Sequence, residues 1–170
     1  TWLLRLLRPP ARAVARVYWN VRVHDSALVP HKGPVILAPN HTGLIDGPLL
    51  AVIAPRPVHA LTKQEMFSRR LGPVLGAAGQ IKLDRFHTDP AAVKACLRVL
   101  RDGGVVGIFP EGTRGDGSLQ RFHRGAAYLA LVTGSPVVPV TMLGTRAPGD
   151  ASSALPERGA DIDVVFGAPW

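Results

Sequence analysis

Short apolar runs recur along the chain and predict a sheet of about seven strands. Several of them, such as VILAP at 35–39 and VVGIF at 105–109, contain no polar side chain, which is typical of strands buried on both faces of a sheet. The predicted strands cover residues 21–24, 34–39, 58–61, 80–83, 105–109, 137–141 and 161–166.

Between these runs, apolar residues return at the three- and four-residue spacing of helices. The predicted helices cover residues 48–54, 64–77, 90–101 and 124–132. Alternating strands and helices predict an α/β fold, a single layered domain in which helices flank a mostly parallel or mixed central sheet. The stretch at 147–159 is rich in Pro, Ser, Ala and Gly and is predicted to be a surface loop.

Residues 1–20 form an amphipathic helical segment with a basic face. On a helical wheel the arginines share one narrow wedge and the apolar residues lie opposite. This pattern is typical of a helix in a membrane interface; the alternative is a helix packed on the domain with a solvated arginine face. Pro9 and Pro10 are expected to break or kink the helix. The basic residues are Arg5, Arg8, Arg12 and Arg16, and the apolar ones Leu3, Leu6, Leu7, Val14 and Val17, with Trp2, Tyr18 and Trp19 at the ends.

The composition limits the class of partner. The 170 residues include 20 Lys and Arg against 12 Asp and Glu, a formal net charge of +8, which indicates nucleic acid, anionic lipid headgroups or phosphorylated small substrates. No run approaches the roughly 20 apolar residues of a transmembrane helix. Cys96 is the only cysteine, which excludes an intrachain disulfide and favours a reducing compartment. Its apolar helical neighbours predict a core residue rather than a nucleophile.

Polar segments occur where three of the predicted strands end. They are PNHTGLID at 39–46, IKLDR at 81–85 and FPEGTR at 109–114. In open α/β sheets the ligand crevice lies beyond the carboxyl ends of the strands. Three polar loops at that edge are therefore expected to converge on one site.

His41 and Asp46 are the candidate acid–base pair. On one continuous helix their five-residue spacing would point them apart, but they meet if His41 lies in the turn after the strand and Asp46 begins the next helix. Pro48 agrees, because proline is tolerated in a first helical turn. A carboxylate bonded to one imidazole nitrogen leaves the other free as a base. The alternative is that His41 caps a turn and Asp46 is an N-cap.

The turn at Glu111, Gly112, Thr113 and Arg114 combines exposed backbone N–H groups with a guanidinium, which suits an anionic oxygen cluster. Lys63 and Arg85 are further cations near strand ends, and solvated loop charges are the alternative for all of them. Motifs of several other enzyme classes are absent: there is no G-x-S-x-G elbow, no P-loop and no G-x-G-x-x-G after the first strand. The six histidines show no metal-ligand spacing. We therefore expect neither a metal nor a cofactor.

Four segments in order resemble the conserved blocks of the glycerolipid acyltransferase family, whose type member is 1-acyl-sn-glycerol-3-phosphate (lysophosphatidate) acyltransferase. They are Asn40-His41-x4-Asp46, GQIKLDR at 79–85, FPEGTR at 109–114 and VPV at 138–140. One His-x4-Asp alone is a weak signal, whereas four blocks in order over most of the chain are a strong one.

The resemblance implies a role for each of these residues. His41 is the general base and Asp46 its orienting partner, so that an acceptor hydroxyl attacks the thioester of acyl-CoA or acyl-carrier protein directly, without an acyl-enzyme. The acceptor is 1-acyl-sn-glycerol 3-phosphate and the product phosphatidic acid. The residues implied to hold the acceptor's phosphate are Lys63, Arg85, Glu111, Gly112, Thr113 and Arg114, with Glu111 expected to brace an arginine or the turn.

The expected partners are an anionic membrane surface, a lysophospholipid acceptor and an acyl-thioester donor, with no nucleic acid. We expect residues 1–20 to be the interface segment and 21–170 the catalytic domain, bound peripherally or monotopically to the cytoplasmic face of a membrane. Two alternatives stay open. One is the same chemistry on glycerol 3-phosphate, another lysophospholipid or a glycolipid, and the other is a non-catalytic basic module that binds membranes.

The chain departs from the family pattern at three positions. Gly43 stands where many members have serine, Leu44 where an aromatic residue is common, and Gly115 where serine is frequent. The first two lie between the base and its partner, where a change is expected to shift acyl or acceptor preference.

Overall fold

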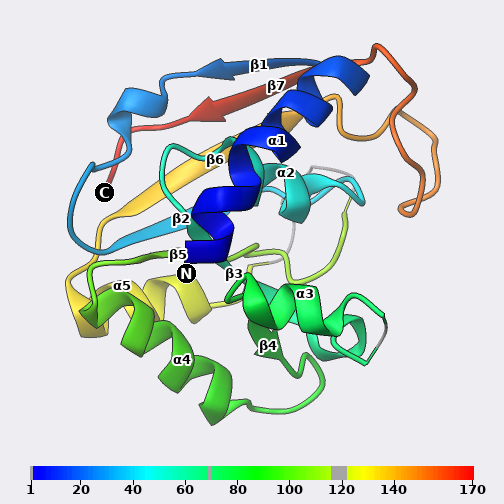
Figure 1. The fold of residues 1–170 in the computed structure, drawn as a ribbon. Coiled ribbons are helices and arrows are strands. Elements are labelled where there is room, and N and C mark those ends of the chain that lie inside the picture. Colours follow the sequence, from blue (N-terminus) through cyan, green and yellow to red (C-terminus); the bar gives the residue numbers. More distant parts are fainter. Residues whose placement is uncertain (1, 69, 116–121) are drawn as a thin grey trace.

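A mixed sheet organises the chain. Within residues 2–68, 70–115 and 122–170, which the computed structural model describes, seven strands pair in the order β1-β7-β6-β2-β5-β3-β4 (Figure 1). Strands β6 and β7 pair antiparallel, and every other neighbouring pair is parallel. This confirms the predicted mixed sheet. The strands are β1 (Asn20–His24), β2 (Val35–Pro39), β3 (Val58–Lys63), β4 (Ile81–Leu83), β5 (Val105–Gly107), β6 (Val137–Leu143) and β7 (Asp161–Phe166).

Helices cover both faces of this sheet. Because neighbouring residues of a strand point to opposite faces, β2 supplies both apolar cores: Leu37 packs with residues of the helix that follows it, and Ile36 packs on the other side with the buried Cys96. The core position predicted for Cys96 is thus confirmed. On the first face lie α1 (Trp2–Tyr18) and α2 (Asp46–Ile53), and on the second α4 (Pro90–Arg101) and α5 (Gly125–Thr133).

The predicted helix at 64–77 is wrong in its extent. The structure has a 3₁₀ turn at Gln64–Met66 and then a short helix, α3 (Gly72–Ala77). Pro73 sits in the first turn of α3, the place a helix tolerates proline. A Cβ at position 72 would lie 2.0 Å from the carbonyl oxygen of Phe67, so the chain turns back on itself here. The apolar spacing alone did not reveal this close approach.

Helix α1 is not broken at its two prolines. It runs without interruption through Pro9 and Pro10, although neither proline has the N–H that would bond the carbonyl four residues earlier. Packing against α2 supports it, since Leu4 and Ala15 are buried. The prediction of a break is therefore wrong.

The basic face of α1 is turned toward the domain. Arg8 donates a hydrogen bond to the carbonyl oxygen of Ala54, and Arg12 Nη2 donates to that of Val52 at 3.0 Å. The alternative of a solvated arginine face is therefore wrong for these two residues, while membrane contact stays a prediction. The outward face is apolar, and its exposed residues are Leu6, Leu7, Val14 and Val17. The side chains of Trp2 and Leu3 lie outside the described part.

No helix in the described ranges combines the length and the apolar character that crossing a membrane requires.

Candidate active site

The predicted site residues follow four adjacent strands of one sheet edge. In the sheet, β2, β5, β3 and β4 are neighbours and run parallel. Their carboxyl ends therefore share one edge, as the sequence predicted. His41 follows β2, the segment 111–114 follows β5, Lys63 ends β3 and Arg85 follows β4.

His41 and Asp46 are in contact. The Nδ1 atom of His41 lies 2.9 Å from Oδ2 of Asp46, and the imidazole stacks obliquely on Phe109 with 4.3 Å between ring centroids. An ionised carboxylate only accepts hydrogen bonds, so Nδ1 must be the donor. In the neutral ring this leaves a lone pair on Nε2, which makes no hydrogen bond within the described residues.

Asp46 is fixed by more than the imidazole. Its Oδ2 atom also accepts hydrogen bonds from the backbone N–H groups of Thr42, at 2.7 Å, and Gly43, at 2.8 Å. The side chain is fully buried, and Asp46 is the first residue of α2, where a negative charge is favoured. Ile45 occupies the N-cap position, so the alternative that Asp46 merely caps the helix is wrong.

The loop after β5 holds the backbone of His41 on both sides. Oε1 of Glu111 accepts a hydrogen bond from the His41 N–H at 2.7 Å, and Gly115 N–H donates to the His41 carbonyl oxygen at 2.8 Å. Glu111 is buried and braces the turn at His41 rather than an arginine or its own turn, the two roles expected of it. Gly112 has φ +67°, and a Cβ there would lie 2.6 Å from the His123 ring, so this turn requires glycine.

The predicted cations differ in how closely they join this network. Arg85 Nη1 is 3.5 Å from the Gly112 carbonyl oxygen, which brings it to the turn. Arg114 Nη1 donates to the Ser152 carbonyl oxygen at 2.5 Å, and so reaches the loop at 147–159. Lys63 and Thr113 make no side-chain hydrogen bond with the network in the described part of the chain. The structure thus joins His41, Asp46 and Glu111 by hydrogen bonds, brings Arg85 to the neighbouring carbonyl of Gly112, and places Lys63 and Arg114 on the same edge.

Four further residues of this edge had no role assigned from the sequence. The amide of Asn40 exchanges two hydrogen bonds with the backbone of Met142, at 2.7 and 3.0 Å, which ties the end of β2 to β6. The hydroxyl groups of Thr42 and Thr145 are 3.1 Å apart. Arg146 Nη2 donates to the Gly115 carbonyl oxygen at 2.8 Å. Arg146 follows β6, so its position after a predicted strand was a signal that could have identified it.

A family model described as Acyltransferase matches residues 20–143, well over half of the chain. The chain therefore belongs to the acyltransferase family. It is similar to the 1-acyl-sn-glycerol-3-phosphate acyltransferase of Bacillus subtilis, with 31% identity over 127 residues, which cover 74% of this chain and 63% of the relative. It is also similar to the human 1-acyl-sn-glycerol-3-phosphate acyltransferase beta, with 32% identity over 157 residues, 81% of this chain and 56% of the relative.

The fold has a solved counterpart. The crystal structure of the 1-acyl-sn-glycerophosphate acyltransferase from Thermotoga maritima superposes with a TM-score of 0.78 at 24% identity, covering 99% of this chain and 69% of that one. This likeness shows the fold. The chain spans less than two thirds of the length of both curated relatives.

Proposed function

We propose that this chain moves a fatty acyl group from a thioester to the free hydroxyl of 1-acyl-sn-glycerol 3-phosphate, giving phosphatidic acid in phospholipid biosynthesis. The observation that carries the proposal is the contact between His41 and Asp46, in a turn that Glu111 also holds. The names of the relatives support the choice of acceptor. The reaction needs no cofactor, and acyl-CoA or acyl-carrier protein is its co-substrate.

Direct transfer suits the arrangement around His41. Nε2 takes the proton of the acceptor hydroxyl while that oxygen attacks the thioester carbonyl carbon. The tetrahedral intermediate then collapses, the C–S bond breaks, and the departing thiolate takes the proton back from the imidazolium. Asp46 stabilises the imidazolium between these steps. No serine or cysteine side chain bonds to the His41 ring in the described residues, so nothing there supports an acyl-enzyme.

The cations of the same edge have the charge to hold the acceptor's phosphate. In this proposal Lys63, Arg85 and Arg114 bind the phosphate together with the backbone of Gly112 and the hydroxyl of Thr113. Fixing the headgroup fixes the hydroxyl against Nε2, and such positioning replaces an encounter in solution by a reaction within one complex. Binding of this kind lowers the acceptor KM as well as raising the rate.

The acceptor and the product are membrane lipids, and the chain has a surface suited to reach them. The outward face of α1 exposes 61% of Leu6 and 72% of Val17, and Leu71 and Val74 near α3 are half-exposed, so core packing does not account for them. We therefore infer peripheral or monotopic binding to the cytoplasmic face of a membrane, with this face of α1 in the lipid.

A kinetic comparison tests the acyl transfer. Purified wild-type protein, His41→Ala and the surface control His31→Ala are assayed with acyl-CoA and a panel of acceptors: 1-acyl-sn-glycerol 3-phosphate, glycerol 3-phosphate, another lysophospholipid and an unphosphorylated glycolipid. We expect turnover of the first acceptor by wild type and His31→Ala and none by His41→Ala. Activity of His41→Ala within a few-fold of wild type would exclude this base, and preference for the glycolipid would exclude the phosphate site.

Vesicle binding separates the catalytic proposal from the non-catalytic alternative. Binding should survive in His41→Ala and weaken in Leu6→Ser/Val17→Ser, because only the latter changes the apolar face of α1. Wild-type protein that binds vesicles but acylates none of the acceptors would favour the non-catalytic module. Unaltered binding of the Leu6→Ser/Val17→Ser variant would exclude α1 as the contact.

A further inference from the structure

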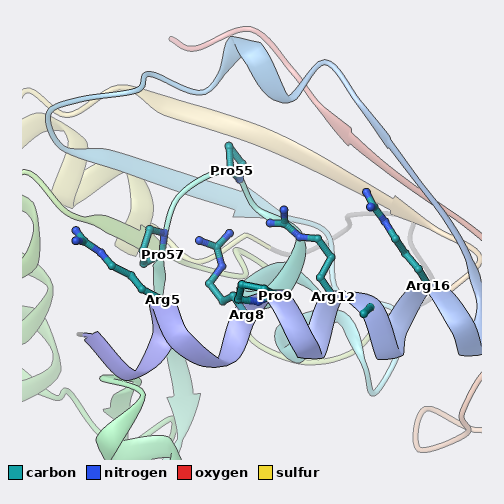
Figure 2. A pocket seen from close by; sticks show the side chains of 8 residues that line it. Arg5, Arg8, Pro9, Arg12, Arg16, Pro55 and Pro57 are labelled. Atoms are coloured by element: carbon teal, nitrogen blue, oxygen red, sulfur yellow. The ribbon is translucent and has the colours of Figure 1, made fainter.

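A pocket of about 480 Å³ lies between α1 and the loop that joins α2 to β3. In Figure 2 four arginine side chains leave α1 on the same side, and those of Arg8 and Arg12 extend toward the loop that carries Pro55 and Pro57. The wheel drawn from the sequence grouped these arginines as the basic face of a membrane-interface helix and predicted no pocket. The residues that define the pocket are Arg5, Arg8, Arg12, Arg16, Pro55 and Pro57.

The positive charge of this pocket has no matching negative charge. Among the described residues, no carboxylate oxygen lies within 4.0 Å of any of the four guanidinium groups. Arg8 and Arg12 donate only to carbonyl oxygens at the end of α2, those of residues 52–54. These carbonyls carry the partial negative charge of a helix C-terminus, well short of the charge of two guanidinium groups. In the same part of the chain, Arg5 and Arg16 donate no hydrogen bond.

One donor in the pocket is buried without a partner. Nε of Arg8 is inaccessible to solvent and makes no hydrogen bond within the described residues. Burial, and next the positive charge of Arg12, lower the pKa of the Arg8 guanidinium below its ordinary value. Two neighbouring guanidinium groups without a counter-charge are unfavourable, and an anion with several oxygens that binds their accessible N–H groups relieves the repulsion.

We propose that this pocket binds the phosphate group of an anionic lipid headgroup. Guanidinium groups match the geometry of phosphate oxygens, and the opposite face of the same helix is apolar and exposed. A helix with its side chains is roughly 10–12 Å across, and interfacial helices sink their apolar face by about 5–10 Å. Inserting the apolar face of α1 therefore brings its arginine face to the depth of the lipid phosphates.

This site is distinct from the candidate active site. Asp46 begins α2, whereas the pocket lies at the other end of that helix, around Ala54. Eight residues of helix span roughly 12 Å, so one phosphate cannot occupy both places. The proposal therefore concerns a second lipid, which orients the enzyme on the membrane and is not acylated.

The test uses Arg5 and Arg16, which are exposed and donate no hydrogen bond within the described residues. Arg5→Gln/Arg16→Gln removes two charges from the pocket and leaves the Arg8 and Arg12 contacts with α2. The matched control is Lys94→Gln/Arg101→Gln, which removes two exposed charges from α4 on the other face of the sheet. Co-sedimentation measures the partition of each protein onto phosphatidylcholine vesicles with and without phosphatidylglycerol.

We expect the partition coefficient of Arg5→Gln/Arg16→Gln on the phosphatidylglycerol vesicles to fall about tenfold or more, because two basic residues near the membrane surface are lost. Partition onto pure phosphatidylcholine should stay the same, and the control should stay close to wild type. Equal losses in both double variants would show a diffuse charge effect and would refute the proposed phosphate site. No loss in either double variant would also refute it.

A second arm separates lipid from soluble phosphate. Inorganic pyrophosphate is added to wild type and to Arg5→Gln/Arg16→Gln, and the change in Tm is compared. If pyrophosphate raises Tm through these arginines and the protein shows no preference for phosphatidylglycerol, the pocket binds a soluble phosphate and the lipid proposal is refuted. Preference for phosphatidylglycerol that depends on the same arginines supports the proposal.

Discussion

Replacing Asp46 by asparagine separates the charge of this side chain from its hydrogen-bonding geometry. One carboxylate oxygen, Oδ2, accepts hydrogen bonds from the backbone N–H groups of Thr42 and Gly43 and from Nδ1 of His41, at 2.7, 2.8 and 2.9 Å. The other oxygen, Oδ1, is buried and has no partner within the described residues. An asparagine that places its oxygen at the Oδ2 position keeps all three bonds and loses the charge, but it puts its NH₂ group at the buried Oδ1 position, where the described residues offer no acceptor.

The two backbone donors decide how the amide of Asp46→Asn is oriented. With the amide flipped, its NH₂ group would face the N–H groups of Thr42 and Gly43. Each buried polar group left unpaired costs about 1–3 kcal/mol, so the two backbone donors cost the flipped form about 2–6 kcal/mol, against about 1–3 kcal/mol for the unpaired NH₂ group of the unflipped form. The oxygen therefore stays at Oδ2, and His41 keeps its proton on Nδ1. What is lost is the charge that stabilises the imidazolium, about 1–3 kcal/mol, which corresponds to a fall in kcat of roughly 5- to 150-fold.

Steady-state kinetics and thermal unfolding measure both consequences. Asp46→Asn should lower kcat within that range, with little change in the acceptor KM and a Tm lowered only by the one unpaired NH₂ group. Asp46→Ala also removes the bonds to Thr42 and Gly43, so it should fall to the activity of His41→Ala and unfold at a lower temperature. Wild-type kcat in Asp46→Asn would mean that the charge is not used. Activity as low as that of His41→Ala would mean that the amide has flipped, which would refute the reasoning from the backbone donors.

Three further predictions test other parts of the structure. Glu111→Gln keeps an acceptor for the His41 N–H, whereas Glu111→Ala should lose about 1–3 kcal/mol of unfolding free energy in urea titrations; equal stability of the two variants would contradict the brace. Hydrogen bonds from Arg22 first, and then from a histidine, hold the pKa of Asp163 below its usual range. Its stabilisation is therefore complete above the unfolded pKa of about 4 and is lost as the pH falls below it, so Asp163→Asn should show a smaller loss of Tm on acidification than wild type. Burial raises the pKa of the Cys96 thiol to about 12, so native protein should not react with a thiol reagent at neutral pH and protein in urea should react fully.

The sequence predicted the sheet and its functional edge well, for a physical reason. Strands buried on both faces have few polar residues, so a short polar segment after an apolar run marks the end of a strand. Parallel strands end at one edge, which is why the segments holding His41, Glu111 and Arg85 were expected to meet. The strand order and the antiparallel pairing of β7 depend on contacts between distant segments, which local patterns do not contain.

The orientation of α1 shows a limit of pattern analysis. A helical wheel identifies two faces but not which of them meets the domain. The acceptors for Arg8 and Arg12 are backbone carbonyls 40 or more residues further along the chain, and carbonyls are present at every residue. The inward arginine face was therefore visible only in three dimensions. Arg146, by contrast, was missed although its position after a predicted strand marked it.

Gly43 is the departure from the family pattern with the clearest structural consequence. A Cβ at this position would lie 2.4 Å from the carbonyl oxygen of Thr145, much closer than real side chains approach a backbone. In this chain the segment after β6 therefore occupies the space that a serine needs. Close packing against Thr145, and not the backbone conformation, is what requires glycine here, because the φ angle of Gly43 is not positive.

Gly43→Ala should therefore push Thr145 away and disturb the turn whose N–H groups hold Asp46. Overpacking of this kind costs about 1–3 kcal/mol, and a displaced N–H at position 43 weakens the support of the catalytic pair, so both Tm and kcat should fall. Gly47→Ala is the matched control: a Cβ there meets no atom within 4 Å, and alanine in a helix is favoured over glycine, so this variant should be at least as stable as wild type and fully active. If Gly43→Ala unfolds at the wild-type temperature and keeps its kcat, the segment at Thr145 yields freely, and the close packing there is not what positions Asp46.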